Sequence, residues 1–193
     1  MGKITAFMSM SIDGFSTGPN VSPDNPMGEG GERLHDWMFS GKAESEAVEF
    51  QERLFKAIGA VITGRRMFDL GVEPWGENPV FHAPVFVLSH RPKEKVVKQG
   101  GTTYRFVTDG AESALQQAKA AAGNKDIMVI GGANIVQQFL KAGWLDEIEI
   151  HLVPILLGEG TRLFEHIDKA IELERIQVTE APDVTHLKFR IIH

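Results

Sequence analysis

The sequence contains no cysteine among its 193 residues. This absence excludes disulfide bonds, thiolate nucleophiles, cysteine-bound zinc and cysteine-bound iron–sulfur clusters. No apolar run approaches the roughly 20 residues that a membrane-spanning helix needs. The N-terminus runs directly into strand-like sequence, with no apolar export segment before it. We therefore expect a cytoplasmic protein without a membrane partner.

Basic residues do not outnumber acidic ones. Twenty lysines and arginines stand against 26 aspartates and glutamates, so the formal net charge is -6. Because proteins that bind a nucleic-acid backbone usually present a basic face, no nucleic-acid partner is expected. The seven histidines are scattered without a metal-binding spacing, so no metal site is predicted. The length and average composition favour one globular domain over residues 1–193.

Strand-like and helix-like segments alternate up to about residue 145, and strand-like segments dominate after it. The predicted strands cover residues 4–12, 60–64, 84–89, 103–107, 127–130, 147–155, 171–178 and 184–192. The predicted helices cover residues 33–39, 43–58, 111–122 and 133–142. This order predicts an α/β domain with a mainly parallel sheet of about eight strands, flanked by helices and ending in an antiparallel hairpin.

Three of the predicted strands end in residues that suit phosphate. One strand runs into Arg65-Arg66, the next into Ser89-His90-Arg91, and a third into Gly131-Gly132 at the start of a helix. Ligands of open α/β sheets bind outside the carboxyl ends of strands, and helix N-termini offer unpaired N–H groups to pyrophosphate. Taken alone, a Gly-Gly turn is more often packing and an arginine pair more often a solvated surface. The three together favour a phosphate-bearing ligand.

Neither common phosphate-binding motif explains these strand ends. The G-x-G-x-x-G pattern does not occur at Gly131, and the sequence has no P-loop lysine. The sequence therefore predicts that a nucleotide is held in another way.

Four segments of the chain resemble the dihydrofolate reductase-like family, in the branch of the RibD C-terminal domain, which is the riboflavin-pathway reductase. They are MSMSIDG at 8–14, VITGRRMF at 61–68, IMVIGGA at 127–133, and LDEI at 145–148 with VPILLGEGTRLF at 153–164. They follow the expected order and span nearly the whole chain. The resemblance implies a single-domain dihydrofolate reductase-like fold, an NADPH-dependent reductase of a small pterin- or pyrimidine-like heterocycle, and a homodimer.

The resemblance also implies which residues bind the cofactor. The segment that contacts the cofactor phosphates corresponds to Gly64, Arg65, Arg66 and Met67. The segment at the adenosine 2′-phosphate corresponds to Leu88, Ser89, His90 and Arg91. The pyrophosphate-binding turn corresponds to Gly131, Gly132, Ala133, Asn134 and Ile135. NAD-specific sites often place a carboxylate on the ribose, whereas these strand ends carry arginines and no immediate carboxylate, which favours NADPH. A flavin is compatible with the loops, but no residue demands one.

The same resemblance places the hydride acceptor between the first-strand turn, the following helix and the nicotinamide. The substrate-binding candidates are Ser9, Asp13, Phe15, Trp37 and Trp75. Reducing a C=N or C=C bond also needs a proton, and Asp36 is the candidate donor, as a partly buried carboxyl group with a raised pKa. The alternatives are that Asp36 only favours a helix start, that Asp13 only fixes a turn, and that both tryptophans pack the core.

Two further functions stay open at this point. One is a true riboflavin-pathway enzyme, 5-amino-6-(5-phosphoribosylamino)uracil reductase. The other is an NADP-binding module without turnover.

Overall fold

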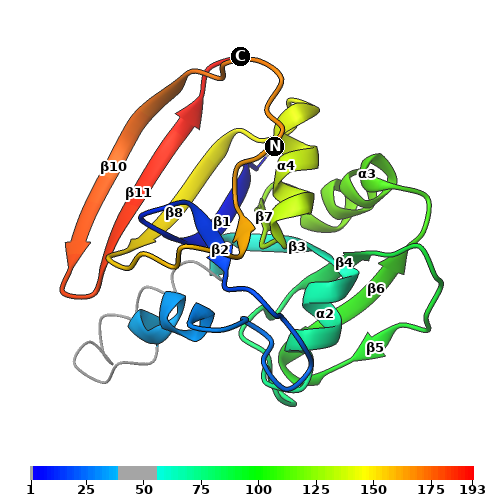
Figure 1. The fold of residues 1–193 in the computed structure, drawn as a ribbon. Helices are drawn as coiled ribbons and strands as arrows, with labels where there is room; N and C mark the ends of the chain where they lie inside the picture. The colour runs from blue at the N-terminus through cyan, green and yellow to red at the C-terminus, as the bar shows by residue number, and fades with distance from the viewer. Residues whose placement is uncertain (1, 39–55) are drawn as a thin grey trace.

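The fold is known from a computed structural model that describes residues 2–38 and 56–193. Within this part of the chain, nine strands form one sheet in the order β10-β11-β8-β1-β7-β3-β4-β6-β5, and β2 pairs with β9 in a separate small sheet (Figure 1). Among the helices of the same residues, none is both long enough and apolar enough to cross a bilayer.

The strands and helices have the following bounds. The strands are β1 Ile4–Ser11, β2 Phe15–Thr17, β3 Ile58–Gly64, β4 Pro84–Leu88, β5 Val96–Val97, β6 Thr103–Val107, β7 Asp126–Val129, β8 Glu147–Val153, β9 Thr161–Arg162, β10 Leu173–Ala181 and β11 Val184–Ile191. The α-helices are α2 Arg65–Gly71, α3 Ala111–Ala122 and α4 Ala133–Lys141. The short 3-10 helices are η1 Gly31–Leu34, η2 Asp36–Met38 and η3 Gln99–Gly101.

The predicted α/β architecture is confirmed. The six strands β8, β1, β7, β3, β4 and β6 run parallel to one another. The last two strands, β10 and β11, form the predicted antiparallel hairpin, which joins the sheet through β8. The ninth strand of the sheet is β5, an edge pair of residues that is too short to give a sequence pattern.

One predicted helix is largely outside the described residues. Of the predicted helix over residues 43–58, only residues 56–58 are described, and the prediction that it extends to Ile58 is wrong. Ile58 begins β3, pairs with Asp126 of β7 and is buried. A short apolar run fits a buried helix and a buried strand equally well, so the boundary could not be read from periodicity.

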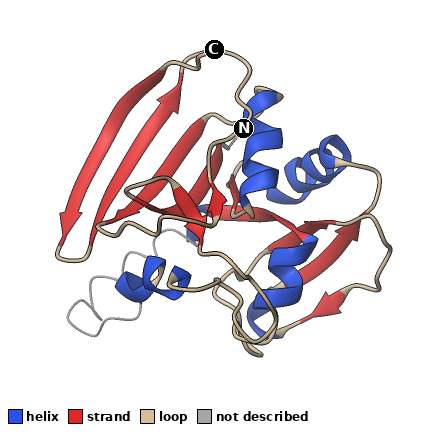
Figure 2. Ribbon diagram, in the orientation of Figure 1, coloured by secondary structure: helices blue, strands red, loops and turns tan. Residues whose placement is uncertain are grey.

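Helices cover both faces of the sheet (Figures 1 and 2). On one face, α3 and α4 pack on the central strands, and the small side chains of Ala114 and Ala118 let α3 approach closely. On the other face, α2 contributes Phe68, which packs edge-on against Tyr104 of β6. The carboxyl ends of the parallel strands lie together at one edge of the sheet, between these two layers of helices.

A third apolar cluster holds the two short helices η1 and η2 against the sheet. Leu34 and Trp37 come from these helices and pack with Val153 of β8 and Val184 of β11. The cluster therefore fixes the segment after the first strand beside the end of β1.

Candidate active site

The three phosphate-suited strand ends lie side by side. The strands β7, β3 and β4 are successive neighbours in the sheet and run parallel. Their carboxyl ends therefore share one edge, where α2 begins at Arg65 and α4 begins at Ala133. The structure thus brings together residues from three separate parts of the sequence.

Hydrogen bonds join the first two of these ends. The Gly64 N–H donates to the Gly131 carbonyl oxygen at 2.7 Å, and the Thr63 hydroxyl donates to the same oxygen at 2.8 Å. Gly131 has a φ of +99°, and a Cβ built there would lie 2.9 Å from the Met8 sulfur. Both the backbone conformation and the space therefore require glycine at this position.

Gly132 faces open space at the start of α4. A Cβ built on Gly132 would meet no atom within 4 Å, and no side chain caps the helix. A helix N-terminus exposes unpaired N–H groups and a positive potential. Of the residues that follow, Asn134 is exposed, whereas Ala133 and Ile135 are buried. The end of β7 therefore offers bare backbone with room for an anionic group.

Arg65 links the ends of β3 and β4. Its Nε donates to both carboxylate oxygens of Asp69 at 2.8 Å, and its Nη1 donates to the Ser89 hydroxyl at 3.4 Å. No carboxylate follows these strand ends immediately, but the carboxylate of Asp69, four residues after Arg65 on one face of α2, lies beside the Arg65 guanidinium.

The loop after β4 supplies more polar groups. The Ser89 hydroxyl donates to the Arg91 carbonyl oxygen at 2.7 Å and accepts from the Arg91 N–H at 3.2 Å. His90 and Arg91 are exposed, while Leu88 and Ser89 are partly buried. The turn thus presents its basic side chains to solvent beside Arg65.

Lys93 belongs to the same basic group, although it is not among the residues predicted from the sequence to bind the cofactor. Its Nζ lies 4.9 Å from the centre of the Phe68 ring and 5.6 Å from that of Phe106. The Arg65 guanidinium lies 5.5 Å from the Phe106 ring centre. Two cations therefore lie within cation–π distance of one aromatic ring, that of Phe106. The basic run 91–95 was the available signal, but the aromatic partners come from α2 and β6.

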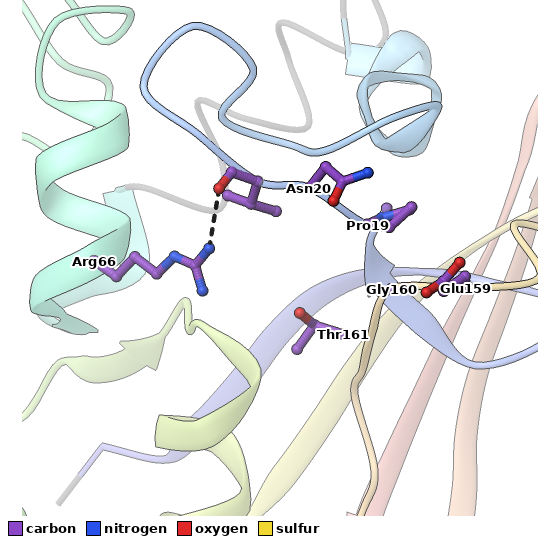
Figure 3. Close-up of a pocket in the computed structure, with 8 residues that line it drawn as sticks. Pro19, Asn20, Arg66, Glu159, Gly160 and Thr161 are labelled. Carbon is purple, nitrogen blue, oxygen red and sulfur yellow. Dashed lines mark hydrogen bonds between the residues drawn. The ribbon is translucent and has the colours of Figure 1, made fainter.

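A pocket of about 270 Å³ opens beside these ends (Figure 3). Its lining residues are Gly18, Pro19, Asn20, Val21, Arg66, Glu159, Gly160 and Thr161. Arg66, from the first turn of α2, points toward the loop 18–21 and donates from Nη2 to the Val21 carbonyl oxygen at 3.4 Å (Figure 3). The pocket thus lies between the start of α2 and two loops. Met67, next along α2, is partly buried and packs with the apolar residues beneath the helix.

Asp13 fixes the turn after β1. Its carboxylate accepts hydrogen bonds from the Ser11 hydroxyl at 2.6 Å and from the N–H groups of Leu157 and Gly158 at 3.1 and 2.7 Å. The Ser11 hydrogen bond, followed by those from Gly158 and Leu157, lowers the pKa of Asp13 to about 2. These bonds tie the β1–β2 turn to the loop before the pocket residues 159–161.

Three of the predicted substrate residues are buried. Trp37 donates from Nε1 to the Leu34 carbonyl oxygen at 3.0 Å and to the Ser9 hydroxyl at 3.3 Å, so the structure brings Ser9 and Trp37 together. Phe15 lies under the Arg162 guanidinium, whose carbon is 4.4 Å from the ring centre. All of these contacts are with other residues of the protein, so they account for the three side chains as packing residues. Their contact with substrate stays a prediction.

Trp75 lies in another cluster from Trp37. Its ring is parallel to Tyr104, with centres 6.2 Å apart, and stands edge-on to Phe81 at 5.2 Å. A Cβ on Gly71 would lie 2.4 Å from the Trp75 ring. These contacts account for Trp75 as core packing on the α2 side of the sheet, and contact with substrate stays a prediction.

Asp36 is exposed, so the expectation of a partly buried carboxyl group is wrong. Its neighbour Trp37 turns inward, 7% exposed, while Asp36 lies on the outer side of η2. A short 3-10 helix buries one side only, and three residues are too few for a periodic pattern to indicate that side. The role of Asp36 in proton transfer remains a prediction.

A pair of histidines lies behind Trp37, with His151 buried and His186 partly buried. His151 of β8 and His186 of β11 are cross-strand partners, and their Nδ1 atoms lie 2.6 Å apart. The His151 ring packs 4.1 Å from Phe7 and 4.7 Å from Trp37, centre to centre. One ring must donate and the other accept in this hydrogen bond, so it is lost if both become imidazolium.

We expect this cluster to make the fold sensitive to acid. Burial lowers the pKa of His151 and His186 from 6.5, and it lowers that of His35, which follows η1, to about 4. Since the folded values lie below the unfolded value, the stability is full above about pH 6.5 and is lost as the pH falls toward the folded values. From about pH 7.5 to about pH 5, the thermal midpoint should fall on the order of 5 °C.

The matched variant is His151→Phe, which keeps an aromatic ring between Phe7 and Trp37. It should show a smaller drop over the same pH range, as measured by circular dichroism melts. Burial raises the pKa of Glu149, so protonation of this carboxylate stabilises the fold as the pH falls, which is opposite to the effect of the histidines. The informative quantity is therefore the difference between the drops in thermal midpoint of wild type and variant. Equal drops in the two proteins would contradict the assignment.

Comparison with known proteins identifies the family of this chain and proteins that it resembles. The family model of the RibD C-terminal domain matches residues 2–187. The uncharacterized protein YyaP of Bacillus subtilis (strain 168) is 29% identical over 125 residues, which are 62% of this chain and 66% of YyaP, just under two thirds of that relative's length.

Two solved structures show the fold. A Shewanella sp. PV-4 protein, provisionally named a riboflavin biosynthesis protein, matches with a TM-score of 0.72 and 23% identity over 99% of each chain. The dihydrofolate reductase of Enterococcus faecalis, solved as a complex with NADP(H), matches with a TM-score of 0.59 and 16% identity over 98% of this chain and 96% of its own. Because the sequence identities are only 23% and 16%, these two structural similarities show the dihydrofolate reductase-like fold alone.

Proposed function

This chain belongs to the RibD C-terminal domain family, and from that premise we propose that it is an NADPH-dependent reductase. The proposed reaction transfers hydride to a small pterin- or pyrimidine-like heterocycle. The observation that carries the proposal is the convergence of three phosphate-suited strand ends at one edge of the sheet. When bound, the cofactor supplies the hydride.

The residues present fit such a cofactor. The open space at Gly132 and the uncapped start of α4 suit a pyrophosphate, which we assign to residues 131–135. Arg65, Ser89 and Arg91 suit a 2′-phosphate, because arginine donors form charge-assisted hydrogen bonds with phosphate oxygens. The bound NADP(H) of the Enterococcus faecalis neighbour, which shares the fold, supports this choice.

We propose that the substrate lies beside the pocket, near the end of β1 and η2. Asp13 holds the turn after β1, and Trp37 holds Ser9, so the chain supplies a fixed wall there. Asp36 is exposed at this segment and can exchange protons with solvent, so we retain it as the candidate proton donor.

Replacing Asp36 with asparagine should slow reduction while leaving NADPH binding within about twofold, because general acid catalysis acts on the chemical step. An exposed donor competes with water, so the loss in kcat should be on the order of tenfold to a hundredfold, at or below the low end for such catalysis. The measurement is steady-state NADPH oxidation together with a binding titration. Glu32→Gln removes an exposed carboxylate from neighbouring η1 and is the control. Unchanged turnover in Asp36→Asn would remove Asp36 from the mechanism.

The experiment that tests the proposed function is NADPH oxidation against a panel of pterins, pyrimidines and flavins, with NADH in parallel. Turnover with one class identifies the substrate. Saturable NADPH binding without oxidation across the panel would favour a binding module, and failure to bind NADPH would overturn the proposal.

A second candidate function follows from the family itself. Because the RibD C-terminal domain is named for the riboflavin pathway, we include 5-amino-6-(5-phosphoribosylamino)uracil in the panel. Reduction of that compound in preference to unphosphorylated pyrimidines would identify the chain as the pathway reductase.

We also propose a homodimer, for which the edge of the sheet gives support. All nine residues of β10 are exposed, and Leu173, Ile176 and Val178 present apolar surface along this edge strand. Unpaired apolar edges are usually covered in stable proteins. Sedimentation equilibrium should give twice the mass of one chain, whereas a monomer mass would contradict the proposal.

A further inference from the structure

We propose that Asp69 is a positioning residue that makes the cofactor site selective for a nucleotide with a 2′-phosphate. It acts by holding Arg65 across the ends of β3 and β4. The inference rests on the proposed NADPH site and adds a residue that has no place in the sequence interpretation.

The contact between the two residues fixes one edge of the guanidinium. Both Asp69 oxygens lie 2.8 Å from the Arg65 Nε, and the pair spans one turn of α2. Arg65 is 33% exposed and Asp69 is 47% exposed, so the ion pair lies at the surface. An exposed ion pair of this kind adds little to stability, so the orientation of Arg65 is its main consequence.

The rest of the guanidinium is directed toward β4. Nη1 reaches the Ser89 hydroxyl, and the guanidinium carbon stands 5.5 Å from the Phe106 ring centre. Arginine has five N–H donors, of which these contacts use two. The Phe106 ring packs near the Arg65 guanidinium, and Asp69 holds one edge of it. The remaining N–H donors of Arg65 are therefore held in a fixed plane, as bidentate phosphate binding requires.

Ser89 extends this arrangement to the next cation. Its hydroxyl donates to the Arg91 carbonyl oxygen and accepts from the Arg91 N–H, so it fixes the backbone of the turn that carries Arg91. Asp69, Arg65 and Ser89 therefore form one chain of contacts from α2 to the loop after β4.

A carboxylate beside a phosphate site has two possible effects, and they have opposite signs. As a nearby negative charge, Asp69 would repel a phosphate, and its removal would tighten binding of NADP+. As a positioning residue, it immobilises Arg65 before the ligand arrives, and its removal would weaken binding. The direction of the change therefore decides between them.

The test is a titration of the full chain with NADP+ and NAD+, for wild type and Asp69→Ala. Alanine favours the helix, so α2 should remain folded. We expect Kd for NADP+ to rise about threefold to tenfold, the cost of ordering one long side chain, while Kd for NAD+ changes less than about twofold. Asp69→Glu, which can still pair with Arg65 at this spacing, should restore the NADP+ value.

Two controls separate this role from simple charge or structural effects. Glu73→Gln removes another exposed carboxylate from the segment after α2 and should leave both affinities unchanged. In an Arg65→Ala background, Asp69→Ala should cause no further loss, because the two residues act as one unit. Tighter NADP+ binding by Asp69→Ala, or equal changes for both nucleotides, would overturn the inference with the NADPH site intact. A wild-type chain without preference for NADP+ would overturn the proposed cofactor as well.

Discussion

Gly132→Val is expected to abolish measurable NADPH binding while the chain remains folded. A Cβ at Gly132 would meet no protein atom within 4 Å, so a side chain can begin there without a clash. The same space is the one assigned to the pyrophosphate at the start of α4. A branched side chain there would keep the phosphate away from the helix N–H groups, with a loss on the order of 100-fold or more in affinity.

The measurement is a fluorescence titration with NADPH beside a thermal melt of the same sample. Valine is a poorer residue than glycine at a helix start, so the melting midpoint should fall by no more than about 4 °C. Gly131→Ala is the comparison, because its positive φ and the nearby Met8 sulfur predict a clear loss of stability at the neighbouring position. Normal NADPH affinity in Gly132→Val would place the pyrophosphate elsewhere.

The second large effect is expected from replacing both Arg65 and Arg91 with alanine. The two side chains are assigned to the 2′-phosphate, which NADPH carries and NADH lacks. Each charge-assisted hydrogen bond contributes about 1.5 kcal/mol at the low end, so NADPH binding should weaken on the order of 100-fold. NADH binding should change by less than about threefold.

A matched control for this variant removes two basic residues elsewhere. Lys169→Ala with Arg175→Ala takes the same charge from two exposed positions, Arg175 on the edge strand β10 and Lys169 in the segment before that strand, and should leave the NADPH affinity unchanged. The loss in the double arginine variant should also shrink at high salt, since exposed charges are screened there. Equal losses for NADPH and NADH would show that the arginines support the fold and not the phosphate.

The strand ends could be predicted from the sequence because the signals are local. Buried strands end at recognisable turns, and in a parallel sheet all such ends face one edge. That reasoning found Gly64, Ser89 and Gly131 without knowledge of the strand order. The Arg65–Asp69 pair was missed, because no helix was predicted over residues 65–71, and residues four apart share a face only on a helix.

Other features depend on contacts between distant segments. The His151–His186 pair is set by the register between β8 and β11, which no local pattern specifies. Lys93 joins the basic group only because Phe68 and Phe106 come from other elements. Burial was the hardest property to predict, as shown by Asp36, which turns outward while its neighbour Trp37 turns inward.

The central claim is that the ends of β7, β3 and β4 together bind one NADPH molecule. A crystal structure of the wild-type chain with NADP+ tests it most directly. The account predicts the pyrophosphate against residues 131–135 and the 2′-phosphate within hydrogen-bond distance of Arg65 and Ser89. A nucleotide bound away from this edge, with these residues free of contact, would contradict it.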